Sequence, residues 1–217
     1  GTFSFYLYDQ LDHDASKGQG DSLTIDFGSV LQATDFDKDS VPLDGLVKVT
    51  VTDDGPAVTL SAKSGAALIL DESVGTVGST QNEGGRQNND ETLSGAASGA
   101  IGFARLAASD LFVETVDAGS DGLGSKAYSL VLNYTASGLV DTASNSAIVL
   151  SLAGNVITGT SSGGHTVFTI ELDSNGQVTV NQFRAVKHND PADHDENGVS
   201  AEMLAAGKIS LQVTVTD

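Results

Sequence analysis

The chain has 217 residues, of which 29 are acidic and 10 are basic, so its formal net charge is −19 at pH 7. This charge argues against nucleic acid and anionic membrane surfaces as partners, because their phosphates would repel it. Self-repulsion also destabilises a compact state unless counter-ions are bound, so we expect folding to depend on divalent cations. The absence of cysteine excludes disulfides and thiolate metal sites, which leaves metal ions as the staples of a small domain.

The apolar content sets further limits. No apolar run approaches the roughly 18 residues of a membrane helix, and no secretory signal peptide is visible. Because Gly1 opens directly into a strand-like run, we expect the chain to be a piece of something longer. Tryptophan is absent and aromatic residues make up 6%, which argues against an aromatic-lined sugar platform, while the 25 glycines indicate many turns.

Alternation of apolar and polar residues predicts three strands in the first part of the chain, at 2–8, 22–27 and 46–51. The loop at 34–40 carries Asp35, Asp37 and Asp39. In a tight loop this spacing turns three carboxylates toward one point, as in the first half of an EF-hand loop. The EF-hand signature itself fails, because the glycine and glutamate that it requires further on are missing. We therefore predict a calcium site of another kind, and the alternative is a solvated acidic loop.

Asp53 and Asp54 directly follow the third predicted strand and precede a Gly-Pro pair. A strand that runs into Asp-Asp-Gly-Pro is typical of a boundary between tandem β domains, where paired carboxylates can share an ion with the next domain. An ordinary Asp-Gly turn is the alternative. We expect 1–57 to be the end of a neighbouring β-sandwich module or an N-terminal β subdomain, and 58–217 to be a calcium-dependent β-sandwich module.

The second part of the chain consists of short alternating runs separated by turns. Asn175-Gly176 is a favoured hairpin pair that joins two of these runs. The run at 100–112 fits a short helix or two short strands, and 201–206 predicts one or two helical turns. Such spacing predicts an all-β fold of β-sandwich modules with long loops and at most short helices. The predicted strands are 58–62, 66–70, 126–133, 147–152, 155–158, 166–172, 177–183 and 208–215.

Acidic and amide side chains concentrate in two polar segments, 73–99 and 188–197. The second segment holds four carboxylates and no Lys or Arg, so their mutual repulsion favours a bound cation. Calcium takes carboxylate and amide oxygens from flexible loops, although a solvated loop is again the alternative. Besides the three aspartates at 35, 37 and 39, we assign as calcium ligands Asp53, Asp54, Asp71, Glu72, Asp90, Glu91, Asp117, Asp121, Asp190, Asp193, Asp195 and Glu196.

Two features bear on the class of protein. The runs at 48–53 and 212–217 are near-repeats, Lys-Val-Thr-Val-Thr-Asp and Gln-Val-Thr-Val-Thr-Asp, which favours modules joined end to end. No zinc-protease His-Glu-x-x-His pattern is present, and no Gly-x-Ser-x-Gly elbow precedes a helix. The carboxylate pairs stand in polar loops, whereas an acid catalyst needs an apolar pocket that raises its pKa. We therefore expect no enzyme.

Several separate runs, in order along the chain, resemble modules of the giant repeats-in-toxin (RTX) adhesins that Gram-negative bacteria secrete through type I systems. The resemblance covers about 58–217, and 1–57 resembles the end of a neighbouring module. The Gly-Gly-x-Gly-x-Asp repeat of the RTX β-roll is absent. The matching runs are Leu-Asp-Glu-Ser-Val-Gly at 70–75, Phe-Thr-Ile-Glu-Leu-Asp-Ser-Asn-Gly-Gln-Val-Thr-Val-Asn-Gln at 168–182, Ala-Val-Lys-His-Asn-Asp-Pro-Ala-Asp-His-Asp-Glu at 185–196 and Ile-Ser-Leu-Gln-Val-Thr-Val-Thr-Asp at 209–217.

The resemblance implies a calcium-dependent, β-rich module at the bacterial cell surface, acting as a monomer beside adjacent modules of the same long chain. Some such modules are spacers, and others bind peptides on host or neighbouring cells through calcium-bearing loops. We favour the binding module because a spacer has little use for the long segment at 73–99. A spacer rigidified by calcium and a glycan-binding module are the alternatives. The residues we assign to ligand contact are Asn88, Asn89, His188, His194 and Asn197.

Overall fold

The computed structural model describes residues 3–13, 20–70, 95–120, 122–189 and 202–216, together with the backbone of 82–83 and 86–87. Strands dominate these residues, which confirms the prediction of an all-β fold. The one α-helix in the described part of the chain is the single turn α1, Ala108–Leu111. Over the same residues, no helix has the length and apolar character needed to cross a membrane.

The chain divides into two compact units that do not follow the order of the sequence. Unit 1 comprises Gly1–Val58, Val116–Lys126 and Val215–Asp217, and unit 2 comprises Thr59–Thr115 and Ala127–Thr214. Two short later segments therefore belong with the first part of the chain. The division that we predict between residues 57 and 58, as a boundary between modules, stays a prediction.

Unit 1 is built on an antiparallel ribbon of β1, Ser22–Asp26, and β4, Lys48–Thr52. Leu23 faces Val51 and Ile25 faces Val49 across the ribbon, so these apolar side chains share one face because residues alternate between faces along a strand. The polar side chains occupy the other face. Along the chain, β1 is followed by the 3-10 turn η2, Gly28–Val30, and then by a small hairpin before β4 begins. The hairpin consists of β2, Gln32–Thr34, and β3, Ser40–Pro42.

The predicted strand at 2–8 is wrong for the residues that the structure describes there. Residues 3–8 have no strand conformation, and Tyr8 is 93% exposed. These residues alternate, but no described strand lies beside them to complete a hydrogen-bond ladder. The ring of Phe5 lies 5.9 Å from the ring of Phe27, measured between centroids. An apolar pocket of about 310 Å³ lies beside this contact. It is lined by Phe3, Ser4, Phe5, Phe27, Val30, Leu31 and Val47.

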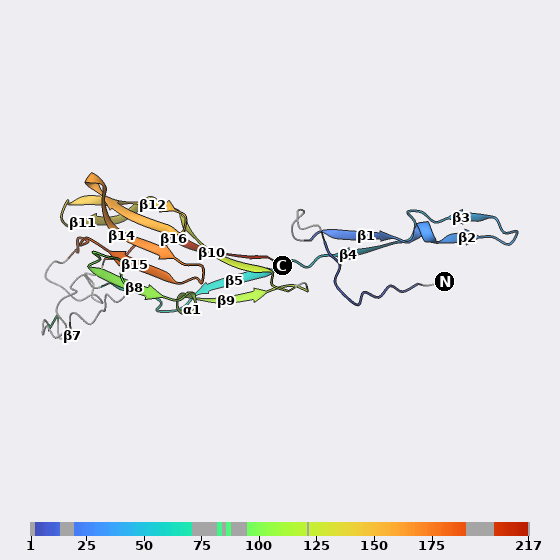
Figure 1. The fold of residues 1–217 in the computed structure, drawn as a ribbon, viewed down its shortest axis with the longest axis horizontal. Helices are drawn as coiled ribbons and strands as arrows, with labels where there is room; N and C mark the ends of the chain where they lie inside the picture. Colours follow the sequence, from blue (N-terminus) through green and yellow to red (C-terminus); the bar gives the residue numbers. More distant parts are fainter. Residues whose placement is uncertain are drawn as a thin grey trace. The chain divides into compact units, whose positions relative to one another are not determined.

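Unit 2 contains a six-stranded sheet in the order β11-β12-β13-β14-β15-β8, with every neighbouring pair antiparallel (Figure 1). Strands β11 to β15 follow one another as a meander, and β8 lies beside β15. The predicted hairpin at Asn175-Gly176 is confirmed, because Gly176 has a positive φ of 80° and its amide donates to the Asp173 carbonyl at 3.1 Å. The strands are β8 Gly102–Leu106, β11 Ala136–Asp141, β12 Ser146–Ala153, β13 Val156–Ser161, β14 His165–Leu172 and β15 Val178–Gln182.

The remaining elements are two further pairs and some short pieces. The strands β5, Ala57–Ala62, and β9, Phe112–Asp117, form one pair, and β10, Ser125–Leu132, and β16, Ile209–Thr216, form the other. Each of these four strands contributes residues to both units. The short pieces are the strands β6, Asn82–Glu83, and β7, Arg86–Gln87, and the 3-10 turn η3, Ser162–Gly164.

Three local predictions differ from the structure. The run at 66–70 is not a strand, and 202–206 is not helical in the described residues. In both segments alternate side chains are half-buried, and Leu68 and Leu204 pack against the core. Each segment therefore covers part of the core without pairing with a strand. The run at 100–112 forms both kinds of element, the strand β8 followed by the turn α1. Strands β9 and β11 were not predicted.

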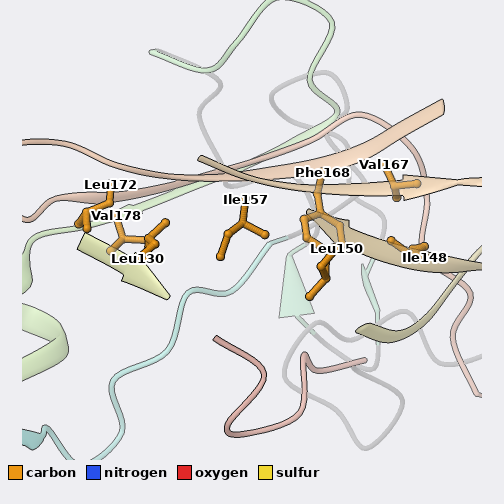
Figure 2. Packing of buried hydrophobic residues seen from close by; sticks show 8 residues of the cluster. All are labelled: Leu130, Ile148, Leu150, Ile157, Val167, Phe168, Leu172 and Val178. Carbon is orange, nitrogen blue, oxygen red and sulfur yellow. The ribbon is translucent and has the colours of Figure 1, made fainter. Parts of the chain in front are cut away.

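The core lies on one face of the six-stranded sheet. Ile148 and Leu150 point into it from β12, and the intervening Val149 is 53% exposed, as a half-buried strand requires. Leu130 of β10 belongs to the same cluster, and Ile209 and Leu211 of β16 pack against it, so a second layer covers this face in the manner of a sandwich. Figure 2 shows Ile157 between one group containing Leu130, Leu172 and Val178 and another containing Ile148, Leu150, Val167 and Phe168.

A β-bulge explains why two consecutive residues of β14 are both buried. Gly159 pairs with Phe168 but Thr160 pairs with Thr166, so Val167 is an extra residue on β14. The Phe168 ring lies over Gly159, where an added Cβ would stand 2.6 Å from the Cζ atom of the ring. The missing side chain of Gly159 is therefore what allows the ring to approach the neighbouring strand this closely.

We expect Gly159→Ala to destabilise the protein by about 1–3 kcal/mol, because the new methyl group overpacks the core against the ring. Phe168→Leu is a matched relief variant, since it removes the atoms that the methyl group would meet. Urea unfolding of both single variants and of the double variant measures the coupling. The double variant should be more stable than the sum of the two losses predicts, and simple additivity would contradict the proposed contact.

Candidate metal-binding site

The predicted calcium loop at 34–40 is the tip of the β2–β3 hairpin in unit 1. Thr34 pairs with Ser40 at its base, with 2.7 Å between their hydroxyl oxygens. The Asp35 amide donates to the Asp39 carbonyl at 3.0 Å, and the Asp39 amide donates to Asp35 Oδ1 at 3.0 Å. Lys38 adopts a left-handed φ of 76°, which reverses the chain within the loop. The tip is thus held by backbone bonds that bring its two ends together.

Asp35, Asp37 and Asp39 converge at this tip, as the sequence predicts. Carboxylate oxygens from the three residues lie within 4.8 Å of one another, and all three residues are exposed. The pKa of Asp35 is lowered, first by its hydrogen bonding with the Asp37 side chain and then by the amide of Asp39, while desolvation acts against this. Three hard oxygen donors that converge in this way could hold a cation such as calcium. In the described part of the chain, no other group of three His or acidic residues converges in this way.

Asp53, Asp54 and Asp117 also belong to unit 1, but they do not gather into such a group. Asp54 accepts hydrogen bonds from the Ser120 amide at 3.0 Å and from the Ser120 hydroxyl at 2.8 Å. Both hydrogen bonds lower the pKa of Asp54, and the bond from the Ser120 amide has the larger effect. Asp117 Oδ1 accepts the Gly119 amide at 3.2 Å. Both carboxylates therefore hold the turn at 117–120, and their assignment as metal ligands stays a prediction.

Most other predicted site residues lie outside the described residues. His188 is described and is half-buried. Those outside are Asp71, Glu72, Asn88, Asn89, Asp90, Glu91, Asp121, Asp190, Asp193, His194, Asp195, Glu196 and Asn197.

The described residues next to the two polar segments belong to the same end of the six-stranded sheet. At this end β11, β13 and β15 finish and β12, β14 and β8 begin, as the antiparallel order requires. The chain enters β8 here, where the Ile101 amide donates to the Gln182 carbonyl at 2.6 Å and the Ala97 amide to Asn181 Oδ1 at 2.8 Å. It leaves β15 from the same place toward His188.

A buried ion pair at this end was not predicted from the sequence. The side chain of Asp141 has no exposed surface, and Arg184 binds it with two nitrogens, Nε to Oδ1 at 3.2 Å and Nη2 to Oδ2 at 3.0 Å. The Ser144 hydroxyl adds a 2.5 Å bond to Oδ2. The Arg184 bond is the main cause that lowers the pKa of Asp141 far below its usual range, and it outweighs desolvation. No short-range pattern links two residues 43 positions apart.

Because the pKa of Asp141 is lower in the folded state, its charge stabilises the fold above the unfolded pKa of about 3.9 and this stabilisation fades as the pH falls below that value. We expect Asp141→Asn to lose about 3 kcal/mol at pH 7, since one partner of a buried pair is removed. Urea unfolding between pH 7 and pH 2.5 should show the deficit shrinking below pH 4. The exposed Asp110→Asn is the control, and a deficit independent of pH would contradict the assignment.

Comparison with known proteins gives one match. The model of a family described as a domain of unknown function, DUF5801, matches residues 67–217, which is more than half of the chain. No curated protein matches the chain significantly, and no solved structure does. The matched range includes the whole six-stranded sheet, with its core and its buried ion pair. Through these residues the chain belongs to the DUF5801 family.

Proposed function

We propose that this chain is a calcium-dependent ligand-binding module of a bacterial surface adhesin. The observation that carries the calcium part is the convergence of Asp35, Asp37 and Asp39, whose carboxylate oxygens lie within 4.8 Å of one another on an exposed hairpin tip. Like charges at this distance repel, and a divalent cation converts the repulsion into attraction. The net charge of −19 supports a general dependence on cations.

The ligand-binding part rests on the end of the six-stranded sheet. Residues 95–101 and 183–189 adjoin the two acidic and amide-rich segments, and both join this end, through bonds such as Ile101 to Gln182. Rigid strands that carry polar loops at one end are a common design of binding proteins. Calcium held by such loops would offer open coordination positions to a ligand carboxylate, such as a peptide C-terminus. Vicinal hydroxyl groups of a glycan are the alternative ligand.

A structural spacer is the second candidate, and a specific feature of unit 1 favours it. The face of the β1–β4 ribbon that carries Leu23 and Ile25 is only partly covered within the unit, since Leu23 is 38% exposed and nearby Val30 is 76% exposed. A two-stranded ribbon is seldom stable alone. Packing of this face on an adjacent module of a longer chain would complete a sandwich, and calcium at the hairpin tip would stiffen it.

We expect calcium to raise the melting temperature and a chelator to lower it, because an ion that binds only the folded state stabilises it by mass action. Asp37→Asn should reduce the calcium-dependent rise, since it removes one of three converging carboxylates without removing the bonds that Asp35 makes to the loop backbone. Asp44→Asn removes the same charge from an exposed position outside the tip and should leave the rise unchanged. Differential scanning calorimetry measures all three.

Replacement of both Asp193 and Asp195 by Ala should remove a further part of the rise, on the basis of the sequence alone. Identical melting curves of the unmodified protein in calcium and in chelator would refute the proposal for every site at once.

Screening against peptide and glycan arrays tests the ligand. We expect hits on extended peptides that vanish when a chelator replaces calcium, because the coordinated ion supplies the contact. Calcium-dependent hits on glycans alone would replace peptide by glycan in the proposal. If neither array gives a calcium-dependent hit while calcium still raises the melting temperature, the spacer is the correct function.

A further inference from the structure

The two edges of the six-stranded sheet differ in how they are covered. At the edge strand β11, the Thr142 amide donates to the Ala185 carbonyl at 2.9 Å and the Lys187 amide donates to the Val140 carbonyl at 2.8 Å, so the segment after β15 continues the ladder there. At the opposite edge, β8 pairs with β15 alone in the described part of the chain. An edge without a neighbour presents unpaired backbone groups, so β8 is where a further strand can join this sheet.

The register of the sheet shows which backbone groups of β15 face β8. The β14–β15 register places Phe183 opposite Val167, and the Phe183 amide donates to the Val167 carbonyl at 2.7 Å. Residues that bond to a neighbouring strand alternate along an antiparallel ladder with residues that bond to the strand on the other side. Val178, Val180 and Gln182 therefore direct their N–H and C=O groups away from β14 and toward β8.

The same alternation identifies the free side of β8. Gly102, Ala104 and Leu106 lie opposite the three residues of β15 that face this strand, so their backbone groups belong to the ladder with β15. The N–H and C=O groups of the intervening Phe103 and Arg105 point to the outer side. No described group bonds to these four outward groups, and together they can pair with an added strand.

The side chains of Phe103 and Arg105 share one face of the sheet, because residues alternate between faces. The guanidinium carbon of Arg105 lies 5.1 Å from the centroid of the Phe103 ring. Arg105 Nε donates to Thr179 Oγ1 at 3.1 Å and Nη2 donates to the Gly95 carbonyl at 3.4 Å, which hold the guanidinium in place. Arg105 is exposed, and no acidic side chain among the described residues pairs with it. A carboxylate on an added strand would supply that partner.

We propose that the outer side of β8 is a docking edge for an extended peptide, which joins the sheet as a further strand and places an acidic side chain beside Arg105. In this mode of recognition, main-chain bonds give affinity and side chains on one face give specificity. The inference rests on the proposed function for its ligand class, a peptide, but it requires no calcium. A second copy of the chain is a poorer occupant, because each copy carries a net charge of −19 and repels the other.

Hydrogen exchange of the unaltered protein, followed by NMR, tests whether the edge is open. The Ala104 and Leu106 amides should exchange slowly because they bond to β15, whereas the Phe103 and Arg105 amides should exchange fast. Protection of the Phe103 and Arg105 amides in the free protein would overturn the docking edge.

A titration with capped seven-residue peptides of alternating Thr and Val, with Glu, Gln or Lys at the centre, tests the ligand. It is done in chelator, so that calcium plays no part. We expect binding to slow exchange of the Phe103 and Arg105 amides, and the Glu peptide to bind up to about fivefold more tightly than the Gln peptide, as for an opposite-charge pair across strands. Arg105→Gln should abolish this preference. A Lys peptide that binds as well as the Glu peptide would contradict the assigned role of Arg105.

Phe103→Pro tests the main-chain bonds, because proline lacks the outward N–H while the ladder to β15 does not use it. Phe103→Ala is the matched control, since it removes the ring and keeps the N–H. The Pro variant should bind the Glu peptide about threefold to tenfold more weakly than the Ala variant, which is the effect of one backbone hydrogen bond. Equal binding by the two variants would overturn strand addition.

A peptide methylated at every amide gives the same test without a variant, and it decides the matter if Phe103→Pro does not fold. It should not bind, because it has no N–H to donate, and binding as tight as that of the unmethylated peptide would overturn strand addition.

The remaining outcomes separate this inference from the proposed function. Calcium-dependent hits on the arrays, together with no binding of the capped peptides, would overturn the docking edge and leave the proposed function standing. Binding of the capped peptides in chelator, with no effect of calcium on melting or on the arrays, would support the docking edge and refute the calcium-dependent function. Sedimentation that shows a dimer which Phe103→Pro abolishes would overturn the peptide as occupant in favour of a second copy.

Discussion

Burial of one face of the six-stranded sheet is the constraint on which unit 2 depends. The strands β10, β12, β13, β14 and β15 each place at least one side chain in a single apolar cluster. Burial of this kind restricts the register of the strands, because a slip of one residue would move every buried side chain to the exposed face. The bulge at Val167 and the contact of the Phe168 ring with Gly159 add local constraints to this register.

A fixed register has consequences at the end of the sheet. Once β11, β13 and β15 finish together, the turn after Asp141, the exit of β15 and the entry to β8 become neighbours. The buried Asp141–Arg184 pair then joins two of these neighbours, and removing either partner would leave the other charge poorly compensated. The described residues that adjoin the two polar segments are in this way held at one end of the sheet by its apolar core.

Aspartate has two distinct roles in the described residues. Asp54, Asp141 and Asp173 accept backbone amides and so hold turns, as when Asp173 Oδ1 binds the Asn175 and Gln177 amides at 2.9 Å. Such carboxylates are neutralised in part by the chain itself. At the hairpin tip Asp35 also accepts a backbone amide, that of Asp39, but its carboxylate lies in addition within 4.8 Å of those of Asp37 and Asp39.

The sequence by itself determined the all-β class, most strands of unit 2, the Asn-Gly hairpin and the convergence at 35–39, because period-two alternation, turn chemistry and i, i+2, i+4 spacing are all local. It could not show that 3–8, 66–70 and 202–206 lack ladder partners, since a strand needs a neighbour from elsewhere in the chain. Nor could it distinguish Asp141 from the other turn aspartates. Only the tertiary structure brought Arg184 to it, because burial and pairing across 43 positions depend on how the whole sheet curls.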